Sequence, residues 1–314
     1  MQNNKQDSLK EKGWFSFIMT SLKGISQVIL IDNAITGLLI LLAITFSSYY
    51  LGIIALLSAM IGTFVGKIGG ADEERINQGL LGYNSVLTGV ALALFLTGPY
   101  MWIVALVGAA IAAIVTAAIM QLLKETDIPV LTFPFIILTW FVLLASYKLK
   151  GIKLSSGLVP QSLMNWELNI AGELDLFHGI FSGMGQIFFI SNAISGILIF
   201  IAVFWAGKKL GLYAVIGNIV ALLISFVLGG ERTLIMSGLY GYNAILTIIT
   251  VSAVYKGKYS RFTLLSGIIA ACLTVPIAAA VSTWLLPYGL PVLTMPFVLC
   301  SWLFIAARKV LPNL

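Results

Sequence analysis

Three pairs of polar side chains in this chain of 314 residues stand in apolar surroundings and could do chemistry there. They are Gln27 and Gln186, Tyr83 and Tyr242, and Thr132 and Thr294, and each tyrosine is followed by an asparagine, Asn84 or Asn243. Amide and hydroxyl groups donate or accept hydrogen bonds without carrying a charge. The residue types therefore indicate a site for a neutral polar solute.

Prolines enclose both threonines of the third pair. They are Pro129 and Pro134 in one case and Pro291 and Pro296 in the other. Proline removes a backbone donor and interrupts the helical ladder, so some carbonyl groups lose their partners. In hydrocarbon such carbonyls must face protein, water or solute. We therefore expect the two broken segments to offer hydrogen-bond acceptors to a solute near the membrane midplane.

The composition places the chain in a membrane. Hydrophobic residues make up 60% and charged residues 10% of the chain, whereas about a quarter of positions in soluble proteins are charged. This excludes a soluble enzyme, and the net charge of +6 indicates membrane lipid rather than nucleic acid as a partner. His178 is the only histidine, and Cys272 and Cys300 lie inside apolar runs. We therefore expect no metal site and no cofactor.

Charged residues are nearly absent at membrane depth. Pumps and ion-coupled transporters usually carry acidic, basic or histidine residues there, because they must bind or move ions. Asp32 is the nearest candidate for a proton relay, but Asp32 and Asn33 stand just before an apolar run, where either can cap a helix. We favour helix capping, and we expect transport to be passive.

The charge-free runs predict the membrane-spanning elements. They cover residues 33–66, 76–123, 128–147, 176–207, 210–230, 233–255 and 262–307. At about 20 residues per crossing, the first three runs hold five spans and the last four hold another five. The apolar stretches 14–31 and 176–191 are left over and predict two re-entrant half-helices. The expected fold class is an all-α polytopic membrane protein.

The two sets of spans belong to an internal repeat. Residues 26–44 match 185–203, and GLLGYNSVLT from Gly79 matches GLYGYNAILT from Gly238, both at an offset of 159, whereas PVLTFPF from Pro129 matches PVLTMPF from Pro291 at an offset of 162. The second half therefore contains a three-residue insertion. Because each half holds an odd number of spans, we expect two inverted homologous halves, each with five transmembrane helices and one re-entrant half-helix.

Loop charges predict the orientation. With loops assigned alternately to the two sides, 14 of the 18 lysines and arginines fall on the side of both termini and 4 on the other. By the positive-inside rule both termini are cytoplasmic. The expected organisation is a cytoplasmic tail at 1–12, a first repeat at 13–147, an external linker at 148–175 and a second repeat at 176–314.

The repeated motifs resemble those of a known family, the urea transporters. A signature of the type Leu-Pro-Val-Leu-Thr-x-Pro-Phe stands at Ile128–Phe135 and Leu290–Phe297, and one of the type Gly-Leu-x-Gly-Phe-Asn stands at Gly79–Asn84 and Gly238–Asn243. The resemblance covers nearly the whole chain and implies a bacterial urea channel. It further implies a homotrimer with one pore per protomer, passive passage of urea across the cytoplasmic (inner) membrane, and no cofactor.

The resemblance also implies roles for particular residues. Gln27 and Gln186 resemble the polar residues at the outer ends of a selectivity filter, and Tyr83 and Tyr242 occupy its aromatic slots, with Leu30 and Phe189 beside them. Val28, Ile187, Leu87 and Leu246 resemble the apolar midsection walls, and Thr132 and Thr294 resemble its hydroxyls. Both slots hold tyrosine where phenylalanine is common, and Leu30 stands where an aromatic residue is expected.

Urea suits such a pathway on chemical grounds. It is planar and uncharged, with four N–H donors and one carbonyl acceptor, so a line of acceptors must replace its water. Other interpretations of the residues stay open at this stage. The tyrosines can belong to an interfacial aromatic belt, the glutamines can bond between helices, and the threonines can bond back to their own helices.

The alternative function is secondary transport of another small amide or polyol. An ammonia channel would carry paired pore histidines, and an aquaglyceroporin would repeat Asn-Pro-Ala, which is absent from the sequence. An intramembrane enzyme would need an acid, histidine or nucleophile constellation at depth. These classes are therefore weaker interpretations than a transporter.

Overall fold

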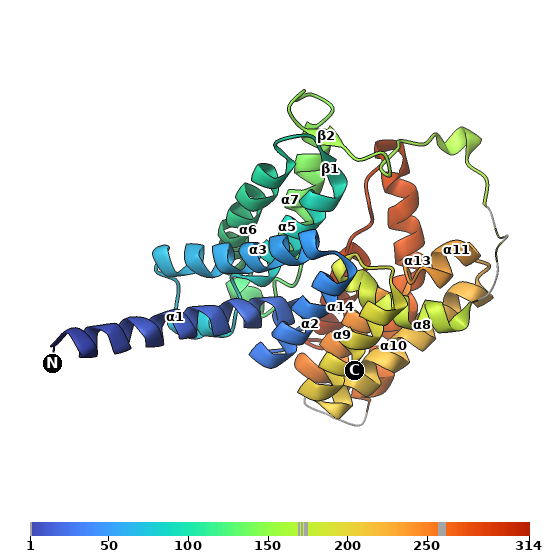
Figure 1. Cartoon of the computed structure of the whole chain (residues 1–314). Helices are drawn as coiled ribbons and strands as arrows, with labels where there is room; N and C mark the ends of the chain where they lie inside the picture. Colours follow the sequence, from blue (N-terminus) through green and yellow to red (C-terminus); the bar gives the residue numbers. More distant parts are fainter. Residues whose placement is uncertain (1, 169, 171, 173–174, 257–261) are drawn as a thin grey trace.

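The computed structural model describes residues 2–168, 170, 172, 175–256 and 262–314, and helices make up nearly all of its regular structure (Figure 1). The first half contains α1 (Gln2–Ser26), η1 (Gln27–Ile29), α2 (Ala34–Ser47), α3 (Tyr49–Ile68), α4 (Glu73–Asn77), α5 (Tyr83–Phe95), α6 (Met101–Leu123), η2 (Lys124–Thr126) and α7 (Phe133–Ala145). After η3 (Leu163–Asn165), the second half contains α8 (Leu176–Gly185), η4 (Gln186–Phe188), α9 (Ala193–Ala206), α10 (Lys208–Val227), α11 (Arg232–Met236), α12 (Gly241–Ile249), η5 (Thr250–Val254), α13 (Thr263–Leu285), η6 (Leu286–Tyr288) and α14 (Met295–Ala307).

The second half repeats the elements of the first half in the same order. α2 and α9, and likewise α3 and α10, begin and end 159 positions apart, whereas α6 and α13, and α7 and α14, are 162 positions apart. The shift arises before α13, because five residues (96–100) separate α5 from α6 and eight residues (255–262) separate η5 from α13. The three-residue insertion therefore lies in this connection.

Four helices are long and apolar enough to cross a membrane: Tyr49–Ile68, Met101–Thr126, Lys208–Val227 and Thr263–Tyr288. Two apolar helix pairs, Gly13–Ile29 with Ala34–Ser47 and Phe177–Phe188 with Ala193–Ala206, are bent by 76° and 74°. Among the described residues, length and composition thus support four spans, or six when each bent pair is one span. The sequence predicts ten, but α7 and α14 have only 13 residues each, because each begins after a proline-broken segment.

The two bends have the same local cause. Leu30 and Phe189 adopt left-handed backbone conformations, with φ of 60° and 61°, and end η1 and η4. Asn33 and Asn192 then cap the next helices, with their side-chain oxygens accepting backbone N–H groups. The cap on α2 is therefore Asn33, one of the two residues that the sequence offered for it, and Asp32 forms an ion pair instead.

Glycine allows α2 to cross α1 closely, and α9 to cross α8. A Cβ atom at Gly37 would lie 1.9 Å from the Leu22 carbonyl oxygen, and one at Gly196 would lie 2.0 Å from the Phe181 carbonyl oxygen. Both distances are far below van der Waals contact, so a larger residue would push the helices apart. α2 and α9 also pack against each other and join the two halves.

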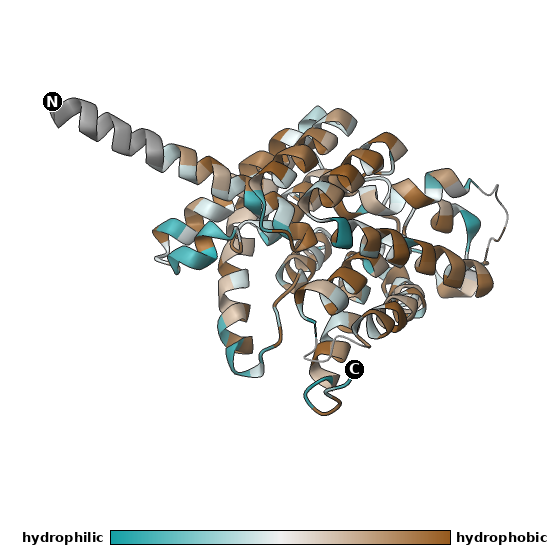
Figure 2. Ribbon diagram, turned by 90° about the horizontal axis from the view of Figure 1, so that it is seen from below, coloured by the Kyte–Doolittle hydropathy of each residue, from teal (hydrophilic) through white to brown (hydrophobic). Residues whose placement is uncertain are grey.

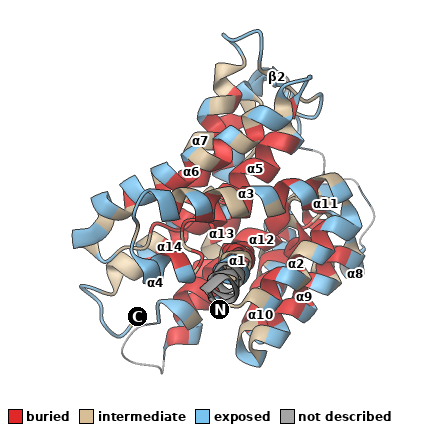
Figure 3. Cartoon of the chain, turned by 60° about the vertical axis from the view of Figure 1, so that its left-hand side comes forward, coloured by how far each residue is buried: buried red, intermediate tan, exposed pale blue. Residues whose placement is uncertain are grey.

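Buried residues gather along the middle of the bundle, and the outward helix faces are exposed (Figure 3). These exposed faces are themselves apolar, as at Ile53 and Phe64 on α3 and Ile114 on α6. Most of the ribbon is hydrophobic, and hydrophilic colour gathers at helix ends and connections (Figure 2). An exposed apolar surface of this extent marks a surface that lipid covers.

A two-residue strand pair adds to the otherwise helical structure. β1 (Leu96–Thr97) pairs antiparallel with β2 (Lys153–Leu154), and Leu96 faces Leu154 in the register. The pair ties the end of α5 to the segment between the halves (Figure 1).

Candidate functional site

Two cavities are lined by matching residues of the two halves. The first has a volume of about 490 Å³ and the second about 330 Å³. Repeat pairs that contribute one residue to each cavity include Gln27 and Gln186, Leu30 and Phe189, Leu80 and Leu239, Tyr83 and Tyr242, Ile128 and Leu290, Pro129 and Pro291, Val130 and Val292, and Leu131 and Leu293. The cavities are thus related by the internal repeat, and six of the twelve residues assigned by the resemblance line them.

α5 and α12 run in opposite directions between these cavities. Tyr83 begins α5 in the lining of the first cavity, and Phe95 ends it in the lining of the second. Tyr242, in the first turn of α12, lines the second cavity, whereas Tyr255, just after η5, lines the first. Each cavity therefore contains the beginning of one helix and the far end of its repeat counterpart.

Both tyrosine hydroxyls bind the backbone of the proline-broken segments. Tyr83 Oη donates to the Leu131 carbonyl over 2.6 Å, and Tyr242 Oη donates to the Leu293 carbonyl over 2.5 Å. Asn84 and its counterpart in α12 donate to the same two carbonyls over 3.3 and 3.4 Å. These two carbonyls lack helical partners, as the prolines predict for some carbonyls of the broken segments, but protein donors occupy them.

In each broken segment, a second backbone carbonyl accepts a hydrogen bond from one tryptophan, and that tryptophan belongs to the other half of the chain. Trp302 on α14 donates its indole N–H to the Pro129 carbonyl over 2.7 Å, and Trp140 on α7 donates to the Pro291 carbonyl over 2.9 Å. Neither tryptophan is among the site residues predicted from the sequence. The repeat carries a signal for them, because Trp140 lies 11 residues after Pro129 and Trp302 lies 11 residues after Pro291, at matching positions of the two halves.

The two predicted threonines meet between the halves. Thr132 and Thr294 immediately precede α7 and α14, and their hydroxyl oxygens are 2.6 Å apart. The exposed fractions of these residues are only 2% and 4%. Residues 162 positions apart in the sequence thus form one buried contact, in which one hydroxyl donates to the other.

The four residues predicted to form the apolar midsection are also buried. Leu87 and Leu246 lie one helical turn beyond Tyr83 and Tyr242 on α5 and α12. Val28 and Ile187 belong to η1 and η4 and are also buried. None of these four residues, nor either threonine, lines one of the two cavities.

The residues predicted to form the aromatic slots differ between the two cavities. In the second cavity, the Phe189 ring lies edge-on to Phe95, with ring centroids 5.6 Å apart, and is also close to Phe135 at 6.2 Å. In the first cavity, Leu30 occupies the matching position. One slot therefore has two aromatic lining residues from the predicted set, and the other combines Tyr83 with an aliphatic side chain.

The glutamine in the second cavity is held by the backbone. Gln186 Nε2 donates to the Ser237 carbonyl over 3.0 Å, and the residue lines the cavity. Gln27 has the matching position in the first cavity. Both glutamines therefore line the cavities, and their role at the ends of a filter stays a prediction.

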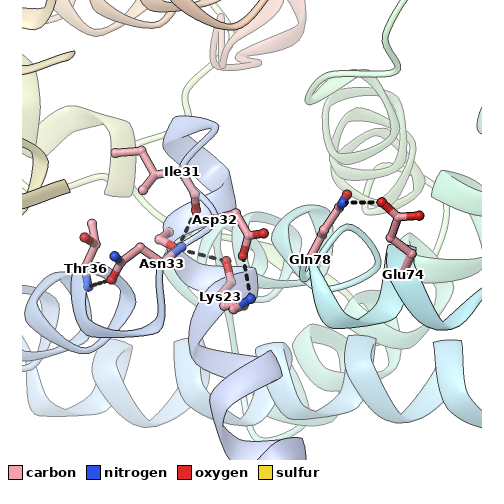
Figure 4. A network of polar contacts seen from close by, with 8 residues as sticks. Lys23, Ile31, Asp32, Asn33, Thr36, Glu74 and Gln78 are labelled. Carbon is pink, nitrogen blue, oxygen red and sulfur yellow. Dashed lines mark hydrogen bonds and ion pairs between the residues drawn. The ribbon is translucent and has the colours of Figure 1, made fainter. Parts of the chain in front are cut away.

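The first cavity carries charges that the second lacks. Asp32, Arg75, Lys124 and Asp127 line the first, whereas the lining of the second contains no charged residue. Lys23 Nζ lies 2.8 Å from Asp32 Oδ1, beside the Asn33 cap (Figure 4). This ion pair links α1 to the turn that follows η1, so Asp32 is not an isolated buried acid.

A further cavity of about 490 Å³ lies among α10, α11, α13 and residues 161–168. It shares Leu234, Tyr240 and Ser282 with the second of the two repeat-related cavities. Its lining combines residues of the second half with Gln161, Leu163, Trp166 and Leu168 from the segment between the halves.

An apolar-surfaced helical bundle with two repeat-related cavities, joined by antiparallel helices, defines a membrane transport protein built from two related halves. Residues 18–309 match the family model described as Urea transporter, and the chain belongs to the urea transporter family. It is therefore an integral membrane protein and a transporter, not an enzyme.

Curated relatives agree with this assignment. The chain is 27% identical over 303 residues to "Urea transporter 1" of Ovis aries, covering 95% of this chain and 79% of the relative. It is 26% identical over 298 residues to "Urea transporter 1" of Rattus norvegicus, covering 93% and 77%. The similarity thus spans both halves of the chain.

Proposed function

We propose that this protein conducts urea passively, as a channel, along the path between the two repeat-related cavities. The observation that carries the proposal is the buried contact of Thr132 and Thr294, whose hydroxyl oxygens lie 2.6 Å apart between the cavities. A neutral solute with several N–H donors can exchange that mutual bond for bonds to both hydroxyls. The number of hydrogen bonds then stays high through the driest part of the path.

The cavities supply the acceptors on either side of the threonines. Urea loses its water on entry, and this loss is costly unless protein acceptors replace the water. In the first cavity the side-chain oxygen of Gln27 takes this role, and the side-chain oxygen of Gln186 takes it in the second. Tyr83 and Leu30 cover the solute on one side of the midsection, and the slot on the other side contains Phe189.

The midsection itself selects for a small neutral solute. Val28, Ile187, Leu87 and Leu246 are buried apolar side chains, so an ion would have no counter-charge there. Of the two repeat-related cavities, the first is the one with charged lining residues, and there Lys23 compensates Asp32. This distribution supports passage without ion coupling.

We also propose the finer architecture that the sequence predicts. Each half contributes five spans and one re-entrant segment, with residues 14–31 and 176–191 as the re-entrant segments and the halves inverted. The opposite directions of α5 and α12 between the cavities support the inversion. The repeats at 13–147 and 176–314, the tail at 1–12 and the external linker at 148–175 follow the same scheme.

Orientation and assembly belong to the same proposal. Both termini are placed in the cytoplasm of a bacterium, with the protein in its cytoplasmic (inner) membrane, because 14 basic residues fall on that side and 4 on the other. A homotrimer follows from the family resemblance, with one pathway per protomer.

Reconstituted protein tests the proposed function. Proteoliposomes loaded with urea are followed by stopped-flow light scattering, with and without H⁺ or Na⁺ gradients. We expect fast urea efflux that is independent of either gradient, above the rate of protein-free liposomes. Accumulation of urea against its gradient, driven by either ion, would establish the alternative, a secondary transporter. Accumulation of another small amide or polyol with no urea flux would do the same.

A further inference from the structure

The tyrosine hydroxyls in the two slots make a contact that phenylalanine cannot make. Tyr83 Oη and Tyr242 Oη donate to the carbonyls of Leu131 and Leu293, the residues directly before the paired threonines. The same contact occurs in both halves, at 2.6 and 2.5 Å. Because the contact recurs at two repeat-related positions, it is a regular part of the structure of both halves.

We propose that these two hydroxyls are positioning groups that set the width of the passage at the threonine pair and thereby exclude N-substituted ureas. This inference rests on the proposed function, because it concerns the selectivity of the same path. The tyrosine rings line the slots, and their hydroxyls act on solute through the backbone they hold.

Backbone conformation supports the positioning role. Leu131 and Leu293 have φ of 50° and 52°, which lies in the left-handed region that residues with a side chain rarely adopt. Such residues persist only where their surroundings hold them in place. Each of these leucines is followed at once by a threonine of the buried pair, so a change at the leucine backbone moves the threonine hydroxyl directly.

The remaining donors do not replace the tyrosines. The asparagine side chains also donate to the two leucine carbonyls, but over 3.3 and 3.4 Å, which are long distances for hydrogen bonds to a carbonyl. Asn84 Nδ2 divides its donors between the Leu131 carbonyl and Thr116 Oγ1. Removing a tyrosine hydroxyl therefore leaves each left-handed leucine with only its longer hydrogen bond.

The test replaces each hydroxyl and measures selectivity rather than rate alone. Tyr83→Phe, Tyr242→Phe and the double variant are reconstituted, and the fluxes of methylurea and urea are measured in the same vesicles. We expect the methylurea-to-urea flux ratio to rise about two- to tenfold in each single variant, as expected for loss of one buried hydrogen bond, and further in the double variant.

Tyr147→Phe is the matched control. The Tyr147 hydroxyl also donates to a backbone carbonyl across the halves, that of Tyr288 at 2.9 Å, but Tyr147 lines neither cavity. We expect its flux ratio to equal that of the parent. A ratio unchanged in the slot variants, or an equal fall of both fluxes, would overturn the positioning role, because a purely structural contact lowers both fluxes together.

A second substitution covers the case in which the phenylalanine variants do not fold. Incorporation of 3-fluorotyrosine at position 83 keeps the ring and the hydroxyl and makes that hydroxyl a stronger donor. We expect the methylurea-to-urea ratio to fall below that of the parent, and an unchanged or higher ratio counts against the proposal. If the parent protein itself conducts no urea, the proposed function fails instead, so the two failures are distinguishable.

Discussion

Replacing Thr132 by valine removes one hydroxyl from the buried contact between the halves and keeps the branched shape of the side chain. Without bound solute, the substitution leaves the Thr294 hydroxyl without its hydrogen-bond partner, the Thr132 hydroxyl, whose oxygen lies 2.6 Å from the Thr294 oxygen. During permeation it removes one of the two hydroxyls that urea meets between the cavities. Thr294→Val has the same consequences from the other half.

The size of the effect follows from burial. Thr132 and Thr294 are 2% and 4% exposed, so water cannot replace the lost partner. A buried polar group without a partner costs about 1 to 3 kcal/mol. At about 1.4 kcal/mol per tenfold in rate, each single substitution should slow urea flux roughly 5- to 150-fold.

The double variant separates conduction from stability. Each single substitution leaves one hydroxyl unpaired, and we expect a lower unfolding temperature in detergent for both. The double variant replaces the polar pair with an apolar pair, a change that is nearly neutral for stability when shape is kept. We therefore expect the double variant to be more stable than either single variant and yet slower in urea flux than both.

Stopped-flow light scattering of proteoliposomes, normalised to reconstituted protein, measures these rates. Thr139→Val is the matched control. Thr139 lies on α7, the helix that follows Thr132, and it is buried and lines neither cavity. Its hydroxyl has no hydrogen-bond partner among the described residues. We expect it to conduct at the parental rate. Parental flux in well-folded Thr132→Val and Thr294→Val proteins would refute the reasoning, since urea would then not use the threonine hydroxyls.

Two further predictions concern the contacts between the halves and the orientation. Trp140→Phe and Trp302→Phe each remove an indole donor to a carbonyl in the opposite half, so each should lower the unfolding temperature in detergent and slow urea flux about two- to tenfold. Trp284→Phe is the control, because the Trp284 ring packs against Trp140, with ring centroids 6.3 Å apart, and lines neither cavity. We expect its urea flux to equal that of the parent. In a cysteine-free background, single cysteines at Ser155 and Lys208 should react with impermeant maleimide from opposite sides of the membrane. Reaction from the same side would contradict the inverted halves.

The sequence alone determined the paired organisation of this protein. Matching residue types at matching positions produce matching local structure, so the offset of 159 between the motifs recurs as the offset between α3 and α10. The prolines around Thr132 and Thr294 predicted broken helices, and both threonines stand directly before the helices that follow. These features depend on neighbours along the chain, and local sequence is sufficient for them.

Helix length was less predictable. Charge-free runs report that a segment can lie in hydrocarbon, but they do not report where its helix begins. The run at 128–147 could hold one span by length, and yet α7 covers only Phe133–Ala145. The backbone before it is held in a left-handed turn at Leu131, and a hydropathy pattern contains no signal for that turn.

Only the tertiary structure decided which groups satisfy the broken backbone. Tyr83 and Leu131 are 48 positions apart within the first half, so their hydrogen bond exists only once that half is folded. Trp302 and Pro129 are 173 positions apart in different halves, so their hydrogen bond exists only once the halves are packed together. The motif indicated free carbonyls, because proline removes their helical partners. Packing then supplied new donors to some of them, since buried carbonyls without partners are costly. The sequence pattern does not show which distant residues provide these donors.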